Sequence, residues 1–153
     1  MESRIHIGKK FRFVAYIQCM EAMILEVLER FARSFDTKDW DEMSACLSDE
    51  LEVDYSSFRN SKPGRITNSE YIRSRKSGLR KLNTQHRLKN PRIAVEGNRV
   101  HSTCDFEIKR FLKNSDRFFH SYGSYAFQLT LDGENWKITS IVQTVNKNEA
   151  FSG

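Results

Sequence analysis

The feature that most limits the fold of this chain is the order of its hydrophobic patterns. Helical spacing dominates the first half of the sequence, and period-two alternation dominates the second half. A chain that separates helices from strands in this way favours an α+β fold, in which helices pack on one face of a sheet. At 153 residues, a single domain with a full hydrophobic core is expected.

The N-terminal half opens with one long helix. Apolar side chains recur at helical spacing over residues 24–35, and the helix is expected to start within residues 11–20. Residues 1–20 are therefore predicted to be an extension that runs into this helix. A single domain over residues 21–149 and a short tail over residues 150–153 would follow. Charged side chains interrupt the apolar run, so no membrane partner is expected.

Two shorter helices and a strand come next. Apolar spacing over residues 40–47 indicates a second helix, and alternation over residues 51–58 indicates a strand with Tyr55 on its apolar side. The sequence TNSE at residues 67–70 is a capping box, which predicts a third helix that ends near Leu82.

The rest of the chain alternates as long strands. Hairpin turns are predicted at EGN (residues 96–98) and DGEN (residues 132–135), so the strands should pair mostly antiparallel. Gly123 indicates a bulge or a close backbone approach. Apolar residues occur on both sides of the final strand, which predicts a homodimer or homotrimer through the sheet; they are Ile138, Ile141, Val142 and Val145.

Charge and cysteine usage point to an ordinary globular protein. The net charge of +5 is spread along the chain, with its densest runs at GKKFR (residues 8–12) and RSRKSGLRK (residues 73–81). Because no aromatic-plus-basic motif accompanies them, these runs are interpreted as solvated helix faces, and no nucleic-acid partner is expected. Three widely spaced cysteines indicate free thiols and a cytoplasmic location. The histidines lack metal-ligand spacing, so no metal is expected.

Three segments carry a resemblance to a known family. FARSFDTKDWDEMSACLSDELEVDYSSF (residues 31–58), LNTQH (residues 82–86) and DGENWKI (residues 132–138) resemble scytalone dehydratases and the wider SnoaL-like group of the NTF2-like superfamily. The resemblance extends over residues 21–149. It implies a cone-shaped α+β barrel, with three N-terminal helices packed on a strongly curved, mostly antiparallel sheet that encloses one pocket. It also implies a small-molecule ligand and no cofactor.

The resemblance also assigns roles. In the dehydratases, an aspartate orients the histidine that transfers the proton, and tyrosines acting through a water polarise the substrate carbonyl. By position in the motifs, Asp36 takes the place of the aspartate, His86 that of the histidine and Tyr55 that of one tyrosine. These three residues are the predicted catalytic group.

Other positions depart from the family pattern. Phe35 replaces a second pocket tyrosine, and Arg110 falls near a second pocket histidine. Arg110 lies on an otherwise apolar strand face, so it needs either a carboxylate of the fold or a substrate anion as its partner. A serine and an asparagine that lie late in the dehydratase sequence correspond in position to Tyr122 and Ser124 here. These two residues are on a polar strand face that could equally be exposed to solvent. The predicted substrate-binding residues are Arg110, Tyr122, Ser124, His120, Phe35 and Phe58.

Each catalytic candidate has a structural alternative. Asp36 could instead cap the second helix, where Asp39 would also favour the positive end of the helix dipole. His86 could be a satisfied structural residue, or a base whose other nitrogen is fixed by a carboxylate. Tyr55 is either a core aromatic residue or a hydrogen-bond donor to an enolate oxygen.

The sequence favours a cofactor-independent lyase or isomerase of dehydratase type. Its substrate would be a small, largely apolar oxygenated molecule that is polyketide-derived, aromatic or steroid-like. The alternative is a non-catalytic ligand-binding or assembly domain, because one fold can host enzymes and binders alike. A third hypothesis is an epoxide-opening or cyclising enzyme with a water between a carboxylate and Arg110. An enzyme requires contact between Asp36 and His86, whereas a binder does not.

Overall fold

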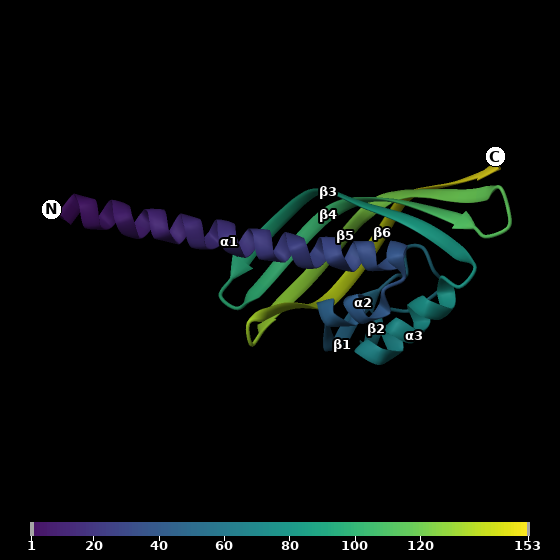
Figure 1. Cartoon of the computed structure of the whole chain (residues 1–153), viewed down its shortest axis with the longest axis horizontal. Helices are drawn as coiled ribbons and strands as arrows, with labels where there is room; N and C mark the ends of the chain where they lie inside the picture. The colour runs from purple at the N-terminus through teal and green to yellow at the C-terminus, as the bar shows by residue number, and fades with distance from the viewer. Residues whose placement is uncertain (1, 153) are drawn as a thin grey trace.

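The computed structural model describes the backbone of residues 2–152 and the side chains of residues 9–152. In this part of the chain, three helices pack on a six-stranded sheet, as Figure 1 shows. The predicted α+β fold is therefore confirmed. The bounds are α1 Glu2–Thr37, α2 Trp40–Cys46, β1 Leu47–Asp54, β2 Gly64–Thr67, α3 Asn68–Gly78, β3 Leu82–Glu96, β4 Arg99–Leu112, β5 Arg117–Asp132 and β6 Asn135–Ser152.

The sheet is curved and mostly antiparallel. Its strand order is β2-β1-β6-β5-β4-β3, and only β1 and β6 pair in parallel. Both predicted hairpin turns are present, and Gly97 and Gly133 each have φ of 63°. Glycine adopts this left-handed conformation without the steric cost that a side chain would add. The four long strands β3, β4, β5 and β6 thus form a continuous antiparallel meander of three successive hairpins.

Helix α1 lies across the sheet, and its N-terminal part projects beyond it (Figure 1). Its start at Glu2 shows that the expected start within residues 11–20 is wrong. Burial begins only at Met20, and residues 9–16 are exposed. Once the packed part of a helix has formed, each further residue adds one backbone hydrogen bond, so the helix extends past its buried face. No helix in the described part of the chain has an apolar stretch long enough to cross a membrane.

Several predicted boundaries shift by a few residues. The first strand starts at Leu47, a residue expected in the second helix, and it ends at Asp54. Tyr55 therefore follows the strand instead of lying within it. The predicted capping box of α3 is present, with Thr67 as the N-cap, but the helix ends at Gly78 instead of near Leu82. At the other end of the chain, β6 continues through residues 150–152, which were expected to be a tail, and residue 153 lies outside the described part.

A β-bulge changes the interpretation of the final strand. Leu129 pairs with Ile138 but Gln128 pairs with Ser140, so Thr139 is an extra residue in β6. The bulge turns Ile138 and Ile141 toward the same side, and both are fully buried in the core. The apolar residues of β6 therefore lie mainly on its core face instead of on both sides. The predicted homo-oligomer through the sheet stays a prediction.

Gly123 marks a close backbone approach, as the sequence indicated. A Cβ atom at this position would lie 1.9 Å from the backbone oxygen of Thr144 and 2.7 Å from the ring of Phe106. The register of β5 against β6 also shifts between Tyr122 and Gly123. A side chain at residue 123 would push the two strands apart, so glycine is required here.

Candidate functional site

A small cavity lies between the helices and the inner face of the sheet. Its volume is about 20 Å³, which is enough for about one water molecule. Four of the predicted site residues line it, together with six others that the sequence did not single out. The lining consists of Phe35, Tyr55, Arg59, Arg75, Gly78, Leu79, His86, Arg110, Tyr125 and Gln143.

Asp36 and His86 are in direct contact beside this cavity. Asp36 Oδ1 lies 2.7 Å from His86 Nδ1, and Asp36 Oδ2 accepts a hydrogen bond from the backbone N–H of His86 at 2.8 Å. The hydroxyl of Thr84 donates to Asp36 Oδ1 at 2.9 Å. Three groups of β3 thus fix the carboxylate, which lies in the last turn of α1. The N-cap of α2 is Asp39, so the capping role considered for Asp36 is not observed.

This contact compensates an unfavourable position for a charge. The C-terminal end of a helix concentrates partial negative charge, which disfavours a carboxylate there. Thr84 and His86 donate hydrogen bonds to the carboxylate and so offset the unfavourable effect of the helix dipole on its charge. Asp36 Oδ1 accepts hydrogen bonds from the side chains of Thr84 and His86, and both of these residues lie on β3. The carboxylate therefore links the end of α1 to the sheet.

The imidazole of His86 is neutral at physiological pH. Its side chain is only 5% exposed. Burial lowers the pKa of His86 below its usual value, and the hydrogen bond and charge of Asp36 oppose that effect. Phe35 stacks on the ring at a centroid distance of 4.7 Å and fixes its plane. The protein thus holds an uncharged imidazole in one orientation.

The contact with Asp36 also sets the tautomer. A carboxylate accepts hydrogen bonds, so Nδ1 of His86 carries the proton and Nε2 carries the lone pair. Nε2 has no hydrogen-bond partner in the described part of the chain. Every fully buried side-chain nitrogen or oxygen in that part does have a partner, so Nε2 is not fully buried. Nε2 must therefore remain accessible, and His86 lines the cavity. The free nitrogen can act as a base toward a molecule in the cavity.

Phenol groups supply hydrogen-bond donors. The hydroxyls of Tyr55 and Tyr71 lie 2.7 Å apart, so one of these two protons remains free. Tyr125 accepts a hydrogen bond from Gln143 Nε2 at 3.0 Å, which leaves its own O–H free to donate. Burial raises the pKa of all three tyrosines, so they are neutral donors. Tyr55, Tyr125 and Gln143 all line the cavity.

Three guanidinium groups converge on the cavity from three elements. Arg59 lies in the loop after β1, Arg75 on α3 and Arg110 on β4. The guanidinium carbons of Arg59 and Arg75 lie 5.4 and 5.0 Å from the ring centroid of Tyr55. That of Arg110 lies 5.0 Å from the ring of Phe58, and its Nη1 donates to Ser121 at 2.9 Å. These are cation–π contacts, which stabilise the positive charges without neutralising them.

Sequence reasoning missed several of these residues. The interpretation of residues 73–81 as a solvated helix face is wrong for Arg75, whose guanidinium lies over the rings of Tyr55 and Tyr71. Arg75 follows the buried Tyr71 by four residues, a spacing that puts both on one helix face and could have revealed it. Arg59 lies in an irregular loop and has no such signal. Tyr125 and Gln143 are inward residues of β5 and β6, which alternation could have indicated.

Three predicted substrate-binding residues lie on the other face of the sheet. His120 contacts Glu107 at 2.8 Å, and the hydroxyl of Tyr122 lies 3.3 Å from His120. Tyr122 is 37% exposed, and Ser124 is on the same outward face. The structure does not bring these residues to the cavity. Phe58 does not line the cavity either, but it covers the guanidinium of Arg110.

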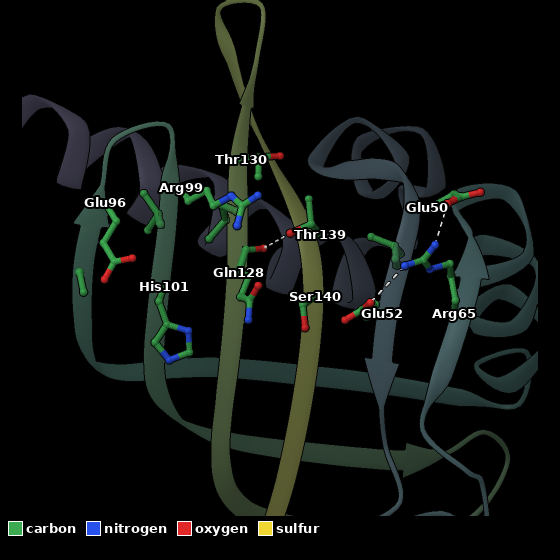
Figure 2. A pocket seen from close by; sticks show the side chains of 14 residues that line it. Glu50, Glu52, Arg65, Glu96, Arg99, His101, Gln128, Thr130, Thr139 and Ser140 are labelled. Carbon is green, nitrogen blue, oxygen red and sulfur yellow. Dashed lines mark hydrogen bonds and ion pairs between the residues drawn. The ribbon is translucent and has the colours of Figure 1, made fainter.

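A larger hollow lies on the outer face of the sheet (Figure 2). Its volume is about 690 Å³, but none of the predicted site residues lines it. Arg65 contacts Glu50 and Glu52 there at 3.7 and 3.3 Å, and these side chains are about two-thirds exposed. Exposed ion pairs of this kind contribute little to binding or stability. The contact between Asp36 and His86 lies at the smaller inner cavity and not at this hollow.

Comparison with known proteins identifies the family and the fold. The family model of the SnoaL-like domain matches residues 19–142. Scytalone dehydratase-like protein claB of Passalora fulva is 28% identical, and the match covers 87% of this chain and 86% of claB.

Two solved structures are similar in fold. The Kfla4162 protein from Kribbella flavida has a TM-score of 0.83 at 18% identity, covering 87% of this chain and 95% of that one. An NTF2-like protein from Cytophaga hutchinsonii has a TM-score of 0.66 at 18% identity, covering 82% of this chain and 97% of its own. The predicted NTF2-like fold is confirmed. Because the family model matches most of the chain, this protein belongs to the SnoaL-like domain family.

Proposed function

We propose that this protein is a cofactor-independent lyase of dehydratase type that removes water from a small hydroxy-ketone. The observation that carries the proposal is the 2.7 Å contact between Asp36 and His86 at the wall of the inner cavity. A buried, neutral imidazole whose Nδ1 is held by a carboxylate presents Nε2 as a general base. Supporting the proposal, the relative claB is named as scytalone dehydratase-like.

The first step is removal of a proton. His86 Nε2 takes a proton from the carbon next to the substrate carbonyl, and the electron pair of that C–H bond moves to the carbonyl oxygen to form an enolate. Asp36 is a positioning residue here, because it holds the tautomer and stabilises the imidazolium that forms. An oriented acid-base group of this kind contributes roughly 10²- to 10⁴-fold to the rate.

The second step is loss of water. The carbonyl re-forms, the carbon–carbon electron pair of the enolate moves to make a double bond between the α- and β-carbons, the bond from the β-carbon to its hydroxyl breaks, and the proton on His86 Nε2 passes to the departing oxygen. The substrate has then lost one water, and His86 is neutral again. One residue can act as base and then acid if both positions lie on the same side of the substrate.

Neutral phenols can stabilise the enolate oxygen between the two steps. Tyr125 has a free O–H because it accepts from Gln143, and the Tyr55–Tyr71 pair has one more. Preorganised donors in a site that excludes water are worth about 3 kcal/mol each. The departures from the dehydratase pattern at Phe35 and Arg110 change what surrounds the substrate but leave the acid-base pair intact.

The test is turnover of a panel of cyclic β-hydroxy-ketones, followed by the absorbance of the conjugated enone product. His86→Ala and Asp36→Asn should each lower kcat/KM by roughly 10²- to 10⁴-fold. His101→Ala is the matched control, because His101 is exposed on the outer face of the sheet and should leave turnover unchanged. Turnover that persists in both dyad variants would exclude this mechanism.

The second candidate is a non-catalytic ligand-binding domain. It is favoured by the three guanidinium groups, which could hold an anionic ligand without any proton transfer. Binding of hydroxy-ketones by the wild type without product formation would support this candidate over the lyase.

A further inference from the structure

The inner cavity carries more positive charge than proton transfer requires. Arg59, Arg75 and Arg110 line it together, and none of them forms an ion pair with a carboxylate among the described side chains. Two arginines of α1 provide a contrast, since Arg30 and Arg33 both contact Glu42. A half-buried guanidinium without a counter-charge is costly, and three together cost more because they repel one another.

Among residues 9–152, no carboxylate lines the inner cavity beside this cluster. Asp36 is the carboxylate of the site, and its oxygens already accept from Thr84 and from the ring and backbone of His86. Burial lowers the pKa of Arg110, and the neighbouring charges of Arg59 and Arg75 lower it further. The cluster is therefore a set of positive charges that a bound anion would stabilise.

The donors of the cluster are free to bind. Each guanidinium has five N–H groups. Arg110 gives one to Ser121 and Arg75 gives one to Ser74, while Arg59 gives none to another side chain among residues 9–152. No buried side-chain nitrogen in this part of the chain lacks a partner, so the remaining N–H groups reach accessible space. The rings of Tyr55 and Phe58 lie 5.0–5.4 Å from the guanidinium carbons and face their positive charges.

The rest of the lining indicates an organic anion. A guanidinium fork matches the two oxygens of a carboxylate, with two parallel hydrogen bonds. Phe35, Leu79 and the rings of Tyr55 and Tyr125 provide apolar surface beside that fork. This mixture suits a carboxylate attached to a carbon framework better than a free inorganic ion.

We propose that Arg59, Arg75 and Arg110 bind a carboxylate group of the substrate, so that the natural substrate is a carboxylated hydroxy-ketone. This inference rests on the proposed function, because it assigns the substrate class of the same cavity. The carboxylate is held at the arginine side while the reacting carbon faces Nε2 of His86. The guanidinium groups now facing the cavity would turn to the anion as it enters, which opens space for the rest of the substrate.

The experiment compares two probes of matched shape, benzoate and benzamide, by titration calorimetry. Benzoate should bind the wild type roughly tenfold or more tightly than benzamide does, since hydrogen bonds to charged groups are the strong ones. Arg75→Gln and Arg110→Gln should each weaken benzoate roughly 10- to 100-fold while benzamide changes little. Arg73→Gln is the matched control, because Arg73 is exposed on the same helix as Arg75 and should change neither affinity.

Further measurements keep the test decisive. Arg110→Lys retains the charge but loses the fork, so it should fold and bind benzoate more weakly than the wild type. Equal affinity of the wild type for benzoate and benzamide would overturn the inference, as would selectivity that survives Arg75→Gln and Arg110→Gln. Phenyl phosphate that binds more tightly than benzoate, with the same arginine dependence, would overturn the assignment of a carboxylate.

Failure of this inference is distinguishable from failure of the proposed function. In the His86→Ala variant, the ratio of the affinities for benzoate and benzamide tests the arginines without any contribution from the proposed base. If that selectivity is present but no hydroxy-ketone is turned over, only the lyase proposal fails. If turnover depends on His86 while benzoate and benzamide bind alike, only the carboxylate proposal fails.

Discussion

Replacing Asp36 with asparagine tests the central contact while preserving side-chain shape. The carboxylate accepts from Thr84 Oγ1 at 2.9 Å, from His86 Nδ1 at 2.7 Å and from the backbone N–H of His86 at 2.8 Å. An asparagine offers one acceptor oxygen, and its NH₂ group can only donate. Whichever way the amide turns, one N–H of His86 then faces another donor.

The cost follows from the lost bond. A hydrogen bond to a charged acceptor contributes about 1.5–3 kcal/mol, and this one is shielded because the side chains of His86 and Asp36 are only 5% and 25% exposed. Asp36→Asn should therefore lower the free energy of unfolding by about 2 kcal/mol. The imidazole can relieve the clash by moving its proton to Nε2, which removes the base. Turnover should fall by roughly 10²- to 10⁴-fold.

The pH dependence gives a second readout. The pKa of His86 is lowered by burial and raised by Asp36. In the wild type, kcat/KM should fall as the pH falls through this pKa, because the base becomes protonated. Without the carboxylate the pKa drops further, so the acidic limb of the profile should move to lower pH. Stability should also decline as the pH falls below the usual histidine value, because the unfolded chain takes up a proton that the folded chain refuses.

The assays are urea unfolding and a pH–rate profile for the wild type and two variants. Asp39→Asn is the matched control, because Asp39 caps α2 and asparagine caps a helix as well as aspartate does. An Asp36→Asn protein with unchanged unfolding free energy and an unshifted acidic limb would refute the reasoning.

Three further predictions concern other parts of the molecule. Gly123→Ala should lower the free energy of unfolding by about 3 kcal/mol or more, because its Cβ would meet a backbone oxygen at 1.9 Å; denaturation measurements should show no such loss for Gly64→Ala, where the space is open. Tyr125→Phe removes the free phenol donor and should lower kcat roughly 10²- to 10³-fold, while Tyr16→Phe on the exposed part of α1 should not. Light scattering should show a homodimer or homotrimer formed through the sheet, and a monomer at all concentrations would contradict that expectation.

Features that depend on neighbouring residues were predictable from the sequence. The capping box at Thr67, the hairpin turns with Gly97 and Gly133, and the separation of helices from strands all appear as expected. Each of them is decided by hydrogen bonds or side-chain periodicity within a few residues. The positions of Asp36 and His86 came from the family resemblance, and their contact is present.

Features that depend on how distant segments pack were not predictable. The extra residue Thr139 reverses the facing of β6, and no local pattern marks it. The polar face with Tyr122 turned out to be the outer one, since alternation defines two faces but not which of them meets the helices.

The sequence by itself predicted the class of fold, through hydrophobic periodicity, and the pairing of Asp36 with His86, through a resemblance carried by short motifs. Only the tertiary structure decided that Arg59, Arg75 and Arg110 meet beside His86 without a carboxylate between them. A loop, a helix and a strand each contribute one of these arginines, and their approach depends on the packing of the whole core. The positive charge of this site comes from residues that are far apart in the sequence, and they meet only when the chain folds.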